Sequence, residues 1–137
     1  MKAPPIAFLC CTVLAGCDAV TNVEWAKTVP GIYEGAESGF KERVDLRSDG
    51  SFQHTVSYDG KQLVGEAGKW SFDVHSGAVR VGPFTAVWDQ ESRKLTTNVT
   101  AWTTGALFVM RYGHAAERIS PSADFSYQLR KQTNSTR

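Results

Sequence analysis

Hydrophobic and polar residues alternate along several short segments of the chain. Residues 51–58 place Phe52, His54 and two further ring or aliphatic side chains on one face, and the same period of two recurs at 69–74, 95–101 and 125–130. Successive side chains of a β-strand point to opposite faces, so this period predicts strands with one buried face. Beyond the first sixteen residues, no segment of ten residues has a helical period.

Short turn signals separate these segments. Ser48-Asp49-Gly50 and Asp59-Gly60 are typical hairpin turns, because glycine adopts the positive φ angle that such turns require. Further corners are predicted at His75-Ser76-Gly77, Asp89-Gln90 and Thr103-Thr104-Gly105. Eight or nine short strands joined mostly as hairpins predict an all-β fold, namely a small antiparallel up-and-down barrel of about eight strands. A two-sheet β-sandwich is the alternative.

The N-terminus has the three-part order of a secretory signal. Met1-Lys2 supplies a positive start, Ile6 to Leu14 carry no charge, and Ala15-Gly16 are the small residues that a signal peptidase requires. The apolar run is much shorter than the roughly 20 residues of a membrane-spanning helix. We therefore expect a cleaved leader and not a spanning anchor.

The tetrapeptide Leu14-Ala15-Gly16-Cys17 resembles the lipobox of bacterial lipoproteins. That resemblance implies a diacylglyceryl thioether on Cys17, cleavage before Cys17, and a further acyl chain on the new amino group. Two or more acyl chains hold a protein stably on a membrane. The implied location is the bacterial cell membrane, with the folded domain in the periplasm, and Asp18 resembles the signal that retains enteric lipoproteins in the inner membrane.

These features divide the chain into four parts. We expect a signal peptide at residues 1–16, a lipidated N-terminus and tether at 17–28, a barrel domain at 29–132 and a polar tail at 133–137. Cys10 and Cys11 leave with the leader, so the mature chain keeps only the acylated Cys17 and forms no disulfide. Trp25 in the tether has two interpretations, a residue at the lipid interface or one packed on the domain.

Charge and motifs exclude several functions. Without Lys2 the mature chain has 14 basic and 14 acidic side chains and no basic stripe, so we expect no nucleic-acid partner. There is no Gly-x-Ser-x-Gly motif and no phosphate-binding loop, which argues against an enzyme, and no cofactor is expected. His54, His75 and His114 lack the paired spacing of a zinc site, so no metal is expected either. His54 shares a face with Phe52 and is predicted to lie in the core or the barrel interior.

The first half of the domain resembles a known barrel family. The segments 31–35 (Gly-Ile-Tyr-Glu-Gly), 44–52 (Val-Asp-Leu-Arg-Ser-Asp-Gly-Ser-Phe) and 68–70 (Gly-Lys-Trp) are similar to the lipocalin-like barrel of bacterial lipoproteins such as the N-terminal domain of NlpE. This resemblance implies the same barrel fold. Members of that family have a cysteine pair after the first strand, whereas this chain has Ala36-Glu37-Ser38-Gly39 there. A redox or copper role that depends on the pair is therefore not expected.

One segment is apolar on both of its faces. It runs from Ala106 to Met110, and Trp102 lies nearby on a face that should be polar. One interpretation is a strand whose outer side is covered by the tether or the C-terminal segment. The other is an exposed patch, formed by Trp102, Leu107, Phe108 and Met110, that contacts a protein partner or the membrane.

Three functions fit these observations. The leading hypothesis is a non-enzymatic, membrane-anchored binding module for an envelope protein or a small apolar ligand. The first alternative is an inhibitor or immunity lipoprotein directed against a cell-wall hydrolase or a toxin. The second is an accessory component of an envelope or secretion complex.

Overall fold

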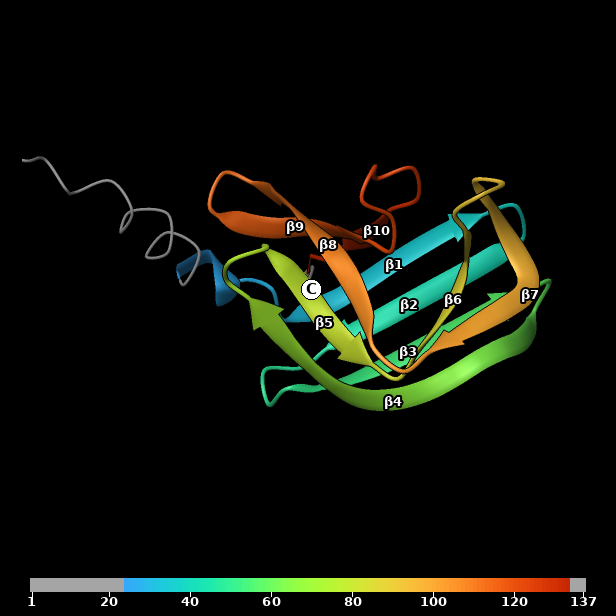
Figure 1. Cartoon of the computed structure of the whole chain (residues 1–137), viewed down its shortest axis with the longest axis horizontal. Coiled ribbons are helices and arrows are strands. Elements are labelled where there is room, and N and C mark those ends of the chain that lie inside the picture. Colours follow the sequence, from blue (N-terminus) through green and yellow to red (C-terminus); the bar gives the residue numbers. More distant parts are fainter. Residues whose placement is uncertain (1–23, 134–137) are drawn as a thin grey trace, which may run out of the picture.

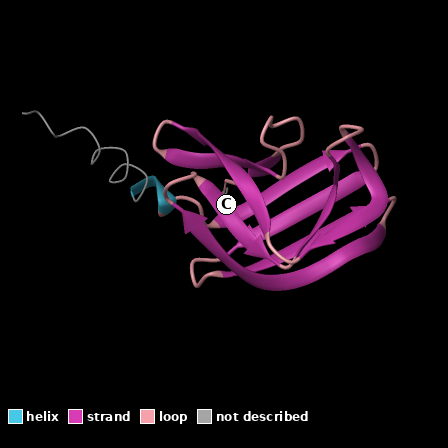
Figure 2. Cartoon of the chain, in the orientation of Figure 1, coloured by secondary structure: helices cyan, strands magenta, loops and turns pink. Residues whose placement is uncertain are grey.

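The computed structural model describes residues 24–133 of the chain, and strands make up most of this part (Figure 2). Residues 24–26 form one short helical turn, and ten strands follow it. The strands are β1 (Gly31–Glu37), β2 (Phe40–Leu46), β3 (Ser51–Tyr58), β4 (Lys61–Asp73), β5 (Ala78–Gly82), β6 (Phe84–Asp89), β7 (Lys94–Trp102), β8 (Gly105–Tyr112), β9 (Ala115–Ser120) and β10 (Leu129–Lys131).

Eight of the strands close into an antiparallel barrel, in the order β1-β10-β9-β8-β5-β4-β3-β2 (Figure 1). The prediction of an all-β, eight-stranded barrel is therefore confirmed, and the sandwich alternative is not the fold. One connection departs from a simple up-and-down order, because β5 pairs with β8. The intervening β6 and β7 form a separate two-stranded hairpin.

The predicted hairpin turns connect the first strands. Asp59 and Gly60 both have positive φ, 47° and 79°, which is the backbone of a two-residue turn with the twist of the flanking strands. Gly50 has a φ of 82° in the turn between β2 and β3, and the Asp49 carboxylate accepts a hydrogen bond from the Ser51 backbone N–H there at 2.8 Å. These turns fix the register of β2, β3 and β4.

The long strand β4 pairs with β3 along its first part and with β5 along its last part. Its first part, as far as Lys69, pairs with β3, and its last five residues pair with β5. Gly68 lies at the change of partner, where a Cβ atom would be 2.4 Å from the carbonyl oxygen of Gly82. After Gly82 the chain leaves the wall at Pro83 and enters β6, so β5 ends immediately before a proline. The hairpin β6–β7 then passes in front of β1, β2 and β3 (Figure 1).

The alternation in 95–101 correctly predicts a strand, β7, but not its environment. The expected buried face contains Leu95, Thr97, Val99 and Ala101, yet only Leu95 packs against the core. Val99 is 38 % exposed, and Thr97 and Ala101 are also exposed. The reason is that β7 pairs only with β6 and is not part of the barrel wall.

The prediction of a strand at 125–130 is wrong for residues 125–128, because β10 begins only at Leu129. Local side-chain hydrogen bonds hold the preceding residues in turns. The Asp124 carboxylate accepts bonds from the hydroxyls of Ser122 and Ser126, and Phe125 has a φ of 55°. Serine and aspartate side chains commonly offer the backbone such an alternative to a strand ladder.

The N-terminal segment belongs to the folded domain. Trp25 is only 5 % exposed, and its ring meets Phe72 edge-on at a centroid distance of 4.8 Å. The Thr28 hydroxyl donates to the Trp25 carbonyl at 2.6 Å and accepts from the Ala116 N–H of β9 at 2.8 Å. Of the two interpretations of Trp25, the structure shows packing on the domain.

Replacing Trp25 with alanine tests this contribution. Loss of a buried tryptophan usually costs about 3–5 kcal/mol of unfolding free energy, and we expect a loss in that range. The measurement is urea unfolding followed by circular dichroism. Lys27→Ala, two residues away on an exposed side chain, is the control and should change stability little. Equal stabilities of the two variants would show that residues 24–28 are only a tether.

Candidate functional site

Three ionisable side chains meet inside the barrel. They come from neighbouring strands: Glu42 from β2, His54 from β3 and Glu66 from β4. The Nε2 atom of His54 lies 2.7 Å from Oε1 of Glu42, and its Nδ1 atom lies 2.8 Å from Oε1 of Glu66. His54 is fully buried and Glu42 is 3 % exposed. Both ring nitrogens of His54 therefore have a carboxylate partner away from water.

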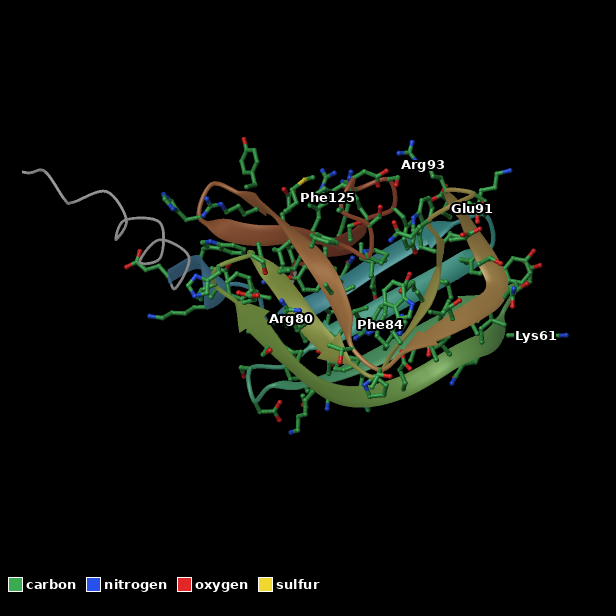
Figure 3. The ribbon with its side chains drawn as sticks, in the orientation of Figure 1. Lys61, Arg80, Phe84, Glu91, Arg93 and Phe125 are labelled. Carbon is green, nitrogen blue, oxygen red and sulfur yellow. The ribbon has the colours of Figure 1, made fainter. Side chains whose placement is uncertain are left out.

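The Glu66 carboxylate also holds the hairpin β6–β7. It accepts the Thr85 backbone N–H at 2.6 Å and the Thr85 hydroxyl at 2.8 Å. The neighbouring Phe84 ring stacks on the His54 imidazole, with a centroid distance of 4.3 Å and an interplanar angle of 10°. Phe84 begins β6 and lies near the middle of the molecule in this view (Figure 3). The cluster thus joins the barrel wall to the hairpin.

The carboxylates determine the charge state of the imidazole. Burial alone would lower the pKa of His54, but the hydrogen bonds and negative charges of Glu42 and Glu66 outweigh burial and raise it. A protonated imidazole donates to both carboxylates at once, which the neutral ring is unable to do. The geometry therefore favours an imidazolium held between two carboxylates.

A second stacked aromatic pair lies near Glu42. The Tyr127 ring stacks on Trp88 of β6, with a centroid distance of 5.5 Å and an interplanar angle of 8°. Burial and the nearby charge of Glu42 raise the pKa of Tyr127. Val87 of β6 packs with Phe40 and other side chains of the barrel wall. Side chains of the hairpin thus fill the space in front of the cluster.

This arrangement limits what the cluster can do chemically. Acid–base chemistry on a substrate requires access to a ring nitrogen or a carboxylate, and His54 has none while the hairpin is in place. Within residues 24–133, no group of three or more His, Cys, Asp or Glu side chains is placed to hold a metal ion. The cluster is therefore a structural clasp between wall and hairpin.

The surface formed by residues 24–133 has several hollows, and one of them is a groove on β1, β2 and β3. It has a volume of about 740 Å³ and crosses the outer side of β1, β2 and β3. Small residues such as Ala36, Ser57 and Gly60 contribute to its lining. Glu34 and Arg43, which also line it, form an exposed ion pair at 2.6 Å. The groove is open to solvent, unlike an enclosed ligand cavity, and an ion pair lies along its apolar lining.

Strand β7 presents a second surface feature, a free strand edge. Among residues 24–133, β7 pairs with β6 on one side and with no strand on the other. From Leu95 to Trp102 it carries no charge, and the five residues from Thr97 to Ala101 are exposed. Natural edge strands usually carry lysine, proline or a bulge that prevents further pairing. Residues 95–102 have neither a lysine nor a proline, but β7 begins with Lys94, and its pairing with β6 shifts register between Ala86 and Trp88.

The structure separates the four residues of the predicted patch. Leu107 is fully buried in the core, and Trp102 on β7 is half-buried against Phe84, with ring centroids 6.3 Å apart. Phe108 and Met110 are half-buried. The four side chains thus do not form one exposed surface.

Sequence reasoning placed His54 inside the barrel but missed both of its partners. Glu42 occupies a buried position in β2, where Phe40, Val44 and Leu46 alternate with exposed residues. Glu66 follows Val64 on the same face of β4. The sequence does contain a signal for these partners. Glu42 and Glu66 each stand at a position where the alternation of the strand predicts an inward-facing side chain, and a buried carboxylate rarely lacks a partner.

The N-terminal predictions concern residues outside the described part of the chain. Cys17 and Asp18 both precede residue 24. Between residues 24 and 133, no helix has the length and apolar character needed to cross a bilayer. No protein-family model, curated protein or solved structure matches the chain.

The raised pKa of His54 predicts how stability depends on pH. In the unfolded chain the pKa is about 6.5, so the stabilisation is complete below that pH and is lost as pH rises through the folded pKa. We expect the unfolding free energy to fall as the pH rises above about 6.5. Urea unfolding at several pH values, followed by tryptophan fluorescence, measures it.

Two histidine variants isolate the source of this slope. His54→Asn should flatten this slope while lowering overall stability, because the buried Glu42 and the half-buried Glu66 lose their cation. His114→Asn, at an exposed position, should keep the slope. An unchanged slope in the His54→Asn protein would show that another group titrates.

Proposed function

We propose that this chain is a lipid-anchored lipoprotein of the bacterial cell envelope whose barrel is a non-enzymatic module that binds another protein. Acylation at Cys17 provides the anchor, and the lipobox-like sequence before it supports this assignment. The barrel faces the periplasm. The observation that carries the binding function is the exposed, uncharged outer edge of β7.

The filled interior favours a protein partner over a small apolar ligand. A lipocalin-like barrel binds such ligands in its interior. Here Phe84, Val87 and Trp88 of β6 are all buried against the inner face of the wall. A ligand would have to displace the hairpin and break the hydrogen bonds between Thr85 and Glu66.

The backbone of β7 suits recognition by strand addition, in which an extended segment of the partner pairs with a free edge. The Thr85 N–H points to Glu66, so it is not bonded to the opposite residue, Ala101. In a non-hydrogen-bonded antiparallel pair, the two opposite residues direct their N–H groups away from each other. The Ala101 N–H therefore points outward, and Ala101 itself is exposed.

The anchor is tested at Cys17. Cys17→Ser should abolish incorporation of labelled palmitate and release the protein from the membrane fraction, because the thiol is the acylation site. The control adds Ser38→Cys to the Cys17→Ser protein, which places a thiol at an exposed turn position of the domain. This thiol should not restore the palmitate label. Membrane sedimentation of Cys17→Ser with palmitate still attached would refute the lipoprotein assignment.

The binding edge is tested at Ala101. Ala101→Pro removes the outward N–H, whereas Ala101→Ser keeps it at nearly the same size. With a photo-reactive amino acid at Val99 in the native host, we expect a specific cross-linked protein in the parent and in Ala101→Ser, and a strong loss in Ala101→Pro. Thermal melting should show that both variants remain folded, since the ladder with β6 does not use this N–H.

The outcome also separates the alternative functions. A cross-linked hydrolase or toxin would favour an inhibitor or immunity lipoprotein, and a component of an envelope complex would favour an accessory role. Equal cross-linking in the proline and serine variants would mean that β7 does not bind by strand addition.

A further inference from the structure

We propose that the end of the barrel formed by the turn between β8 and β9 rests on the membrane surface, with Tyr112 in the lipid headgroup region. This inference rests on the proposed lipid anchor at Cys17. The inference gives the folded domain a fixed orientation on the membrane. It also gives the domain a membrane contact of its own, in addition to the lipid anchor.

The turn between β8 and β9 lies beside the point where the described chain begins. The Arg111 guanidinium lies over the Trp25 ring, 5.3 Å from its centroid. Thr28 and Ala116 are joined by a hydrogen bond of 2.8 Å. Figure 1 shows this turn and the helical turn at residues 24–26 at the same end of the molecule.

The length of chain before Glu24 brings this end close to the bilayer. Trp25 is packed in the core, so the neighbouring Glu24 is held at the domain. In the sequence, seven residue steps separate Cys17 from Glu24. A fully extended chain covers at most about 3.6 Å per residue, or roughly 25 Å in all. A small domain is about 30 Å across. The opposite end of the barrel therefore cannot approach the bilayer unless the tether runs along the barrel.

The side chains at this end suit a lipid surface. Tyr112 is 83 % exposed, the most exposed of the large hydrophobic side chains in residues 24–133. Tyrosine and tryptophan are enriched at membrane interfaces, because the ring is apolar and its hydroxyl is polar. Such a position explains why a hairpin tip carries a large ring that contacts little of its own domain.

The charges at this end are balanced. Exposed Lys27 and Arg111 are offset by exposed Glu24 and Glu117. A polybasic surface would bind anionic lipids by charge, at about 1 kcal/mol per basic residue. Lys131, half-buried, adds one positive charge beside Thr28, to whose carbonyl it donates. Without a polybasic cluster the contact is mainly aromatic, and it should depend little on the charge of the lipid.

This orientation directs the proposed binding edge away from the membrane. Glu91 and Arg93, in the turn between β6 and β7, lie on the side of the molecule away from the helical turn at residues 24–26 (Figure 3). The hairpin β6–β7 is therefore displayed toward the periplasm. The contact of Tyr112 would limit rotation of the domain about its tether.

Site-specific fluorescence on the acylated full-length protein tests the proposal. Two single-cysteine variants, His114→Cys beside Tyr112 and Glu91→Cys at the far end, carry an environment-sensitive fluorophore. The proteins are inserted in phosphatidylcholine vesicles, with and without phosphatidylglycerol, that contain a headgroup-region quencher lipid. We expect the label at position 114 to be quenched several-fold more than the label at 91, equally in both lipid mixtures.

A second substitution separates the role of Tyr112 from mere proximity. Tyr112→Ser in the His114→Cys protein should reduce the quenching, and Thr97→Ser, at an exposed position on β7, should leave it unchanged. Equal weak quenching at 114 and 91 in protein that still sediments with vesicles would overturn the orientation and leave the anchor intact. Protein that lacks acyl chains and does not sediment would overturn both.

Discussion

Placing the buried Glu42 and the half-buried Glu66 in the barrel has a desolvation cost, and the structure offsets that cost at a single imidazole. Glu42 and Glu66 reach His54 from the two strands that flank β3, so the register of three strands must be correct before the cluster can form. A shift of one residue in either strand would turn a carboxylate to the outer face. Removing one member of such a buried set is usually far more destabilising than replacing the whole set with apolar residues. The cluster therefore specifies the register of the wall as well as stabilising it.

The same cluster explains why the hairpin β6–β7 folds over the barrel and not away from it. Glu66 has lone pairs that His54 does not use, and the backbone and hydroxyl of Thr85 occupy them. The rings of Phe84 and Trp88 then cover the site from the hairpin side. A hydrogen bond to a charged group is stronger than one between neutral groups, and exclusion of water strengthens it further. Polar contacts thus place the hairpin, and apolar burial holds it there.

Sequence patterns predicted the barrel well, because the turns and alternation of β2, β3 and β4 follow directly from local residues. The same patterns failed where tertiary context decides. Val99 and Ala101 look like a buried face, but β7 leaves the wall and they are exposed. The segment before Leu129 alternates like a strand, yet Asp124 and its serine neighbours form turns. For the site, His54 was placed correctly in the interior. The pairing with Glu42 and Glu66 was missed, because it follows only when the inward phase of both carboxylates is combined with the register that the two turns set.

The connection between β5 and β8 makes the hairpin a separable insertion. Val81 and Gly105 are paired across these strands, and a Cβ on Gly82 would lie 2.7 Å from the Thr103 carbonyl oxygen, so the chain leaves and re-enters the wall at almost one point. A tight turn across that point would complete an eight-stranded meander without the twenty or so residues between. Evolution can therefore lengthen, shorten or exchange the hairpin with little change in the paths of the other strands. The wall residues that face the hairpin must change with it. They include Glu66, which binds Thr85, and the side chains that pack on Val87 and Trp88.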